Sequence, residues 1–147
     1  MDENAKQLRL NEFERLCQER GIPCTVQRHA ILEAVLERDD HPTAEQIFRT
    51  VSERHHGISR ATVHRTLETL VSMDMIAKLC HPGSVTRYDP RTGIHHHLMC
   101  TRCNRVIDFQ DEHLDAIRLP DTSAFGFEVV DLRVELRGLC KQCRDER

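Results

Sequence analysis

The stretch SRATVHRTLETLVSMDMIAKLC, residues 59–80, passes from a predicted helix into a predicted strand. Ser59 is a helix-capping residue type, and apolar residues follow it at spacings of three and four, as on one buried helix face. They are Val63, Leu67, Leu70 and Val71. Ile76–Cys80 and Val85–Tyr88 read as short strands around the turn signal HPGS at 81–84. A capped helix that leads into a hairpin is typical of a winged helix.

Three more helices are predicted upstream of this stretch. The first includes Leu10–Cys17 and ends at Gly21-Ile-Pro23, and the second begins after the capping residue Thr25. The third begins after Thr43, which forms a capping-box pair with Gln46. Three helices, a capped fourth helix and a hairpin follow the order of a winged helix-turn-helix domain.

The pattern changes after a linker at residues 89–93, and we expect an α+β protein with a second, small α/β domain. Its predicted elements are strands at 97–100 and 105–109, a short helix at 111–118 and an alternating strand at 129–136. The predicted divisions are a winged-helix domain at 1–89, a hinge at 90–94 and a second domain at 95–147.

Composition narrows the class of protein. The chain has 147 residues, a net charge of −3, seven Cys and ten His. The acidic balance excludes a globally basic nucleic-acid-binding protein, although it allows a local basic surface. No stretch approaches the roughly 18 apolar residues of a membrane span. Residues 1–10 lack the character of a signal peptide, so we expect a cytoplasmic protein with reduced thiols.

Two C-x-x-C pairs predict a structural zinc site. Cys100 and Cys103 form the first pair, Cys140 and Cys143 form the second, and 36 residues separate the pairs. Zinc takes four thiolates in a tetrahedron, and a two-residue gap lets both sulfurs of a pair bind one ion. The alternatives are redox dithiols or ordinary buried cysteines. The other cysteines, Cys17, Cys24 and Cys80, are expected to be small buried side chains.

A group of imidazoles and carboxylates suggests a second metal site. His95 and His97 point to the same side of a strand, because alternate residues share a face. Together with His41, Asp89 and Asp108 they would suit Fe²⁺, Mn²⁺ or Zn²⁺. The alternative for His41, Asp89 and Asp108 is that each is a solvated surface residue.

The start of the fourth helix is the candidate DNA-reading surface. Residues 49–65 contain four Arg and one Glu, which is a local charge of +3 in an acidic chain. A helix N-terminus of this kind can contact phosphates and enter the major groove. The candidates are Arg28 from the second helix and Arg60, Thr62, His64 and Arg65 from the fourth. The alternative is an amphipathic helix with a polar outer face.

Several short motifs occur along the chain, and their combination and order are more specific for a protein family than any one of them. They are TVQR at 25–28, HPTA at 41–44, SRATV at 59–63, RYD at 87–89, HHH at 95–97 and the two cysteine pairs. From about Glu12 to Cys143 the chain resembles the ferric uptake regulator (Fur) superfamily.

The resemblance implies a metal-dependent transcriptional repressor and no enzymatic activity. It implies that residues 1–89 bind DNA and that residues 95–147 serve for dimerisation and metal binding. The resulting homodimer would bind a pseudo-palindromic DNA operator and take no small organic substrate. One structural Zn²⁺ per subunit would bind the four cysteines. Regulatory Fe²⁺ or Mn²⁺ would bind between the two domains, to His41, Asp89, His95, His97 and Asp108. Zinc-enzyme signatures such as H-E-x-x-H are absent from the sequence.

Two aspartates favour one branch of the superfamily. Positions 89 and 108 are Asp, as in the peroxide-sensing PerR branch, where iron-responsive Fur proteins typically carry Glu. A second metal site common in Fur proteins would use Ile94, His96, Asp115 and Leu132, and two of these cannot ligate. We therefore expect peroxide sensing by metal-catalysed oxidation of His41 or His95. The alternatives are an iron-responsive repressor of metal uptake genes or another metal sensor of the family.

Three positions depart from the usual family pattern. His64 stands where a DNA-contacting Tyr is usual, and Asp74 and Asn104 stand where Gly is usual. None of these departures removes a predicted metal ligand.

Overall fold

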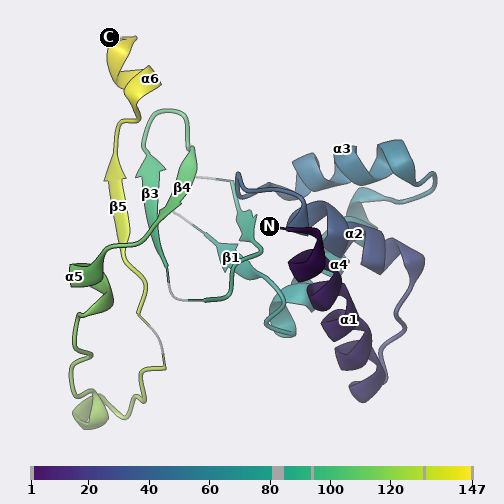
Figure 1. Ribbon diagram of the computed structural model, residues 1–147, viewed down its shortest axis with the longest axis horizontal. Coiled ribbons are helices and arrows are strands. Elements are labelled where there is room, and N and C mark those ends of the chain that lie inside the picture. Colours follow the sequence, from purple (N-terminus) through teal and green to yellow (C-terminus); the bar gives the residue numbers. More distant parts are fainter. Residues whose placement is uncertain (1, 81–84, 94, 131, 147) are drawn as a thin grey trace. The chain divides into compact units, whose positions relative to one another are not determined.

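The computed structural model describes residues 2–80, 85–93, 95–130 and 132–146 (Figure 1). The chain divides into two compact units, residues 1–92 and 93–147. The first unit is helical with a β-hairpin, and the second is a small sheet with short helices, so the predicted fold class is confirmed. The predicted turn at 81–84 and position 94 of the hinge lie outside the described residues.

The first unit has four helices and a hairpin in the predicted order. Its elements are α1 (Glu3–Glu19), α2 (Val26–Leu36), α3 (Ala44–Arg54), α4 (Arg60–Ser72), β1 (Ala77–Leu79) and β2 (Arg87–Asp89). Thr25, Thr43 and Ser59 cap α2, α3 and α4, and Thr43 and Gln46 complete the capping box. Helix α1 begins upstream of the predicted apolar stretch because the Asp2 side chain accepts a hydrogen bond from the Ala5 amide.

One hydrophobic core joins the four helices of this unit. Phe13, Ile31, Ile47 and Leu67 come from different helices and are fully buried in the same cluster. Val63 also points inward from α4, whereas Arg60, Ala61, His64 and Arg65 of the same helix are exposed. The core therefore fixes which face of α4 meets solvent, and that face carries the predicted DNA-reading side chains.

Two of the residues that depart from the usual family pattern have left-handed backbone angles. Asp74, just after α4, has φ 56° and Asn104 has φ 57°. Asp74 belongs to a Schellman turn, in which the Met75 amide donates to the Leu70 carbonyl at 3.0 Å. Gly adopts such angles without strain, and Asp and Asn tolerate them better than other residues do. Both substitutions therefore preserve the turns in which glycine is usual.

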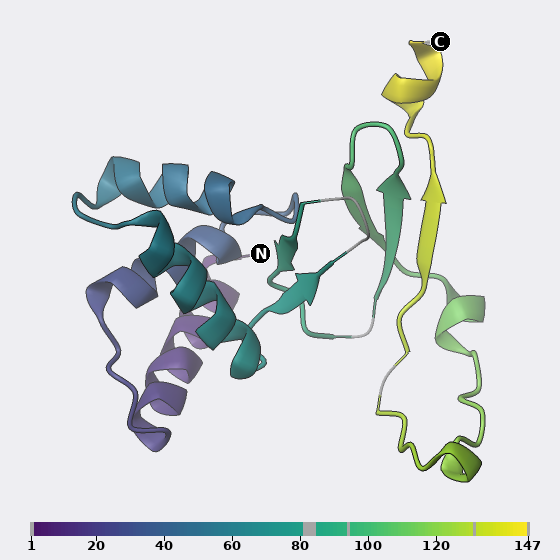
Figure 2. The same ribbon diagram turned by 180° about the vertical axis from the view of Figure 1, so that it is seen from behind.

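A three-stranded sheet forms the centre of the second unit. Its elements are β3 (His96–Cys100), β4 (Val106–Phe109), α5 (Glu112–Asp115), a 3₁₀ turn (Ser123–Phe125), β5 (Glu135–Gly138) and α6 (Lys141–Asp145). Figure 2 shows β3 between its neighbours, antiparallel to β4 and parallel to β5. In this register, Leu98 of β3 lies opposite Ile107 of β4 and Leu136 of β5.

Two predicted elements of the second unit are wrong in extent. The strand predicted at 129–136 is β5, which begins only at Glu135, and residue 131 of the predicted range lies outside the described residues. Strand β3 begins at His96, so the alternating residues upstream extend past the strand with which they could pair. The helix predicted at 111–118 covers only Glu112–Asp115, and none of its residues is buried. Residues 116–118 are exposed, so extending the helix would bury no further apolar surface to stabilise it.

In the described part of the chain, every helix is too short or too polar to cross a membrane.

Candidate metal centres and nucleic-acid interface

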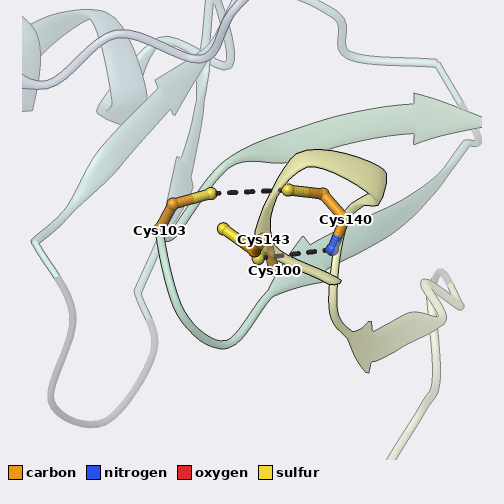
Figure 3. Close-up of side chains that lie close together, drawn as sticks. All are labelled: Cys100, Cys103, Cys140 and Cys143. Carbon is orange, nitrogen blue, oxygen red and sulfur yellow. Dashed lines mark hydrogen bonds between the residues drawn. The ribbon is translucent and has the colours of Figure 1, made fainter. Parts of the chain in front are cut away.

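The sheet register explains why the two cysteine pairs meet. Cys100 ends β3, and Gly138 ends β5 at the paired position of the parallel ladder. Parallel strands end at the same edge of a sheet, so the residues that follow each strand are neighbours. Cys103 lies in the loop after β3, and Cys140 and Cys143 lie at the start and in the middle of α6 (Figure 3). The sulfur atoms of all four cysteines lie within 4.8 Å of one another.

The sulfur positions fit a tetrahedral metal. Cys103 Sγ and Cys140 Sγ are 3.8 Å apart. A tetrahedral zinc with bonds of about 2.3 Å to sulfur separates its ligands by about 3.8 Å. The cluster is therefore a metal-binding site of the type that holds structural Zn²⁺, and the four ligands leave no open position on the ion.

The local environment gives two thiols of the cluster different pKa values. Backbone amides of Cys103 and Cys140 point at the Cys100 sulfur and lower the pKa of this thiol to about 6, and the Cys140 amide lies 3.4 Å from it. Burial raises the pKa of Cys143 to about 12. Metal ligation requires thiolates, so binding an ion at this cluster releases the Cys143 proton at neutral pH.

In the second unit, three further side chains converge at the start of β3. The Nε2 atoms of His95 and His97 are 3.1 Å apart. Asp108, opposite His97 on β4, places Oδ1 at 3.8 Å from His95 Nε2 and 3.6 Å from His97 Nε2. Two nitrogens bound to one metal at about 2.0–2.1 Å and 90–110° apart would be about 2.9–3.4 Å from each other. The spacing of the imidazoles suits a shared ion.

In the first unit, His41 and Asp89 form a buried pair. His41 Nε2 lies 3.9 Å from Asp89 Oδ2, and the exposed fractions of the residues are 2% and 0%. The other carboxylate oxygen, Oδ1, accepts a hydrogen bond from the Arg91 amide at 2.8 Å. This bond orients the carboxylate so that Oδ2 faces the imidazole. The solvated-surface alternative is therefore wrong for these two residues.

The backbone around His41 is unusual and is held by β2. His41 has φ 51°, in the left-handed region that non-glycine residues rarely adopt. Its carbonyl accepts a hydrogen bond from Arg87 Nη1 at 2.9 Å, and the Pro42 carbonyl accepts one from the Tyr88 amide at 3.0 Å. Strained backbone of this kind persists only where neighbours fix it, and it concentrates at functional sites. Arg87 belongs to the RYD motif, but its contact with the His41 carbonyl joins residues 46 positions apart and could not be predicted from the sequence.

His96 has a different role from its neighbours. Its Nδ1 accepts a hydrogen bond from the Val134 amide at 3.1 Å, so Nε2 carries the proton and donates to Asp115 Oδ1 at 3.0 Å. Both ring nitrogens of this buried histidine are thus used inside the second unit. These two hydrogen bonds of His96 join β3 to α5 and to the residue before β5. Of the two positions that cannot ligate, Leu132 is half-buried, and Ile94 lies outside the described residues.

Three of the five predicted DNA-contacting residues lie together, and the other two lie apart from them. Arg28, Thr62 and Arg65 line one polar hollow of about 360 Å³, together with Pro23, Thr25, Gln27 and Thr66. Arg28 is held there by a 2.8 Å hydrogen bond from Nη1 to the Pro23 carbonyl. His64 is exposed on the same helix. Arg60 instead contacts Glu45 and Phe48 of α3, which sequence analysis did not single out.

The three remaining cysteines differ in their exposure to solvent. Cys17 is buried in the helical core, as expected. Cys24 and Cys80 are exposed, so the expectation that they are buried is wrong. Cys24 lies in the loop before the cap of α2, and Cys80 follows β1, so neither belongs to an apolar helix face.

A winged helix joined to a small domain with a four-cysteine cluster and grouped His and Asp side chains defines a metal-dependent transcription regulator. Residues 19–137 match the model of the Ferric uptake regulator family. The chain belongs to this family, which confirms the resemblance read from its motifs. Its members are transcriptional regulators that bind DNA and metal ions.

A curated relative and solved structures are similar to this chain in sequence or in fold. A peroxide-responsive repressor PerR of Staphylococcus aureus is 33% identical over 86% of this chain and 85% of its own length. The Helicobacter pylori ferric uptake regulator Fur superposes with a TM-score of 0.82 at 19% identity, over 95% and 93% of the two chains. A zinc-bound manganese uptake regulator has a TM-score of 0.66 and 30% identity, over 86% and 97%.

Proposed function

We propose that this chain is a dimeric repressor that binds DNA with Fe²⁺ or Mn²⁺ and releases it when peroxide oxidises His41 or His95. The observation that carries the proposal is the carboxylate of Asp108, which lies 3.6–3.8 Å from the ring nitrogens of both His95 and His97. Asp at this position and at 89 is the pattern of the PerR branch. The similarity to peroxide-responsive repressors at 31–33% identity supports the same choice.

Each unit offers part of a ligand set. The first unit supplies the buried pair His41 and Asp89, and the second supplies His95, His97 and Asp108. We infer that one ion takes ligands from both sets in the DNA-binding state. An ion that binds better to one arrangement of the units shifts the population toward it. The DNA-binding arrangement would then depend on the metal, and loss of one imidazole would weaken it.

The imidazoles of His41 and His95 would lie next to the metal, where peroxide is expected to react. Fe²⁺ held by these ligands would supply the electron that starts cleavage of the peroxide O–O bond. Overall the imidazole would be oxidised, with one peroxide oxygen added at a ring carbon and the other leaving as water. Mn²⁺ would supply charge and ligand geometry without this reaction. Burial of His41 and His95 keeps bulk water from their rings and places them beside the carboxylates of the site. An imidazole that has gained oxygen is a poorer nitrogen ligand, so the affinity for the metal falls.

The first test compares DNA release by peroxide with release by a chelator. Protein loaded with Mn²⁺ or Fe²⁺ should bind a selected duplex, and a chelator should release it in both forms. Peroxide should release only the Fe²⁺ form, which fluorescence anisotropy of labelled duplex would measure. Release by chelator with no effect of peroxide on the Fe²⁺ form would favour a sensor of metal supply instead. The likeness to a manganese uptake regulator at 30% identity keeps that second candidate open.

An exposed apolar row supports the proposed homodimer. Leu98, Ile107 and Leu136 lie side by side across the three strands of the second unit, and each is 40–45% exposed. Together with Leu139 they line a hollow of about 200 Å³. Apolar rows on a sheet face are favourably buried against another surface. A second copy of the sheet would cover this row and bring two α4 helices to one pseudo-palindrome.

Leu136→Glu should convert the dimer to a monomer. The substitution places a charge at one end of the apolar row, where burial against a partner would remove it from water. Analytical ultracentrifugation should show the monomer, and affinity for the selected duplex should fall with it. Val130→Glu is the matched control, because Val130 is 90% exposed outside the row. A Leu136→Glu protein that still sediments as a dimer would contradict this assignment of the interface.

We also propose that the protein works in the cytoplasm, where thiols remain reduced and available to zinc.

A further inference from the structure

Arg60, the first residue of the recognition helix α4, is fixed by two side chains of α3. Its Nε lies 2.8 Å from Glu45 Oε2, and its Nη2 lies 3.0 Å from Glu45 Oε1. The guanidinium carbon stands 4.2 Å above the centre of the Phe48 ring. One edge of the guanidinium is thus used in a bidentate ion pair, and one face rests on an aromatic ring.

The contacts leave the other edge of the guanidinium available. A guanidinium carries five N–H donors in a fixed planar fork. Glu45 uses the edge formed by Nε and Nη2, so the edge formed by Nη1 and Nη2 points away from the carboxylate. The side chain of Arg60 is 63% exposed. Two parallel donors on an exposed arginine edge match the O6 and N7 acceptors of guanine in the major groove.

Glu45 is a stable partner at neutral pH. The hydrogen bond from Arg60 lowers the pKa of the Glu45 carboxyl, and Arg49, at 3.3 Å, lowers it further. The carboxylate therefore remains charged and continues to hold Arg60. A carboxylate near DNA also repels phosphates, so Glu45 of α3, held against the first residue of α4, would weaken binding to DNA unless it also improves a base contact.

We propose that Glu45 is a positioning residue for sequence readout: with Phe48 it presets Arg60 so that its free edge reads a guanine. The benefit is specificity rather than affinity, because the carboxylate weakens binding to any duplex while it orients one base contact. The inference rests on the proposed DNA-binding function, and it deepens that function by naming how one base is selected.

The test separates specific from non-specific binding. A duplex is first selected from a random library with Mn²⁺-loaded protein, and affinity is measured for it and for a scrambled duplex. Glu45→Gln should bind the scrambled duplex as tightly as the original protein or more tightly, and the selected duplex more weakly. The ratio of the two affinities should fall about tenfold, since one bidentate arginine contact supplies roughly 5- to 150-fold of discrimination.

Two further variants keep the result interpretable. Glu53→Gln removes the same charge from α3, about 12 Å farther along the helix, and should leave the ratio unchanged. In an Arg60→Ala background, Glu45→Gln should have no further effect on the ratio, because there is no side chain left to position. Thermal melts would verify that each variant is folded, as expected for substitutions at exposed positions.

Three results would overturn the inference. An unchanged ratio for Glu45→Gln would show that Glu45 does not affect readout. A rise of both affinities by one factor would show that it only repels phosphate. An equal fall of the ratio in the Arg60→Ala background would show that it acts through another group. If no duplex can be selected at all, the proposed DNA-binding function fails, and this inference fails with it.

Discussion

Cys143→Ser should unfold the second unit and abolish DNA binding. Structural zinc contributes about 10–16 kcal/mol of apparent binding free energy in small zinc domains, and this energy is folding energy. Among the described residues after Gly93, Met99 and Val106 are the buried hydrophobic side chains other than cysteine. Such a small core cannot hold the sheet alone, so the ion must replace the missing apolar burial.

Hydrogen exchange resolved by peptide would measure this effect. Amides of β3, β4 and β5 should lose protection in Cys143→Ser, while the helices of the first unit keep theirs because their core is separate. Cys80→Ser is the matched control, since Cys80 is an exposed cysteine outside the cluster. Full zinc content together with native protection in Cys143→Ser would rule out the structural role of this ligand.

Fe²⁺-loaded protein treated with peroxide should gain one oxygen atom on the peptide that holds His41 or on the one that holds His95. Losing an imidazole ligand should weaken metal binding by at least the 10- to 100-fold that loss of an outer-shell partner costs. Release of DNA should follow the same time course as the oxidation. Peptide mass spectrometry of samples withdrawn during an anisotropy measurement would compare the two rates.

Two controls separate this mechanism from other oxidation. The Mn²⁺ form should show neither the added oxygen nor release of DNA. Asp108→Glu should retain metal-dependent DNA binding but respond weakly to peroxide, because the longer carboxylate changes the surroundings of His95 and His97. If peroxide modifies only cysteines, or if Asp108→Glu responds fully, the proposed histidine mechanism is wrong.

Local sequence signals predicted the first unit well. The caps at Thr25, Thr43 and Ser59 and the regular apolar spacing of α2 to α4 act within a few residues, so the sequence shows them directly. The long strand predicted at 129–136 was wrong because alternation indicates which residues could be buried, and not whether a partner strand is present. Pairing depends on β3, which lies more than 30 residues away in the sequence.

The same distinction between local and distant signals applies to the candidate sites. Ligand types and C-x-x-C spacing pointed to the cysteine cluster, and strand alternation placed His95 beside His97. The hydrogen bonds that hold His41 and Asp89 could not be predicted, because they depend on a backbone angle and on a distant arginine. The ion pair between Glu45 and Arg60 was missed for a related reason. It joins two helices, and single-helix spacing gives no signal for it.

The parallel pairing of β3 and β5 has a kinetic consequence. The two strands meet only after a loop of more than 30 residues has closed, and closing a loop of this length is an early entropic cost of folding. An ion bound to one C-x-x-C pair can capture the second pair as soon as the strand ends approach. Zinc would then act as a clamp that shortens this search, so the second unit should fold faster when zinc is present than when it is absent.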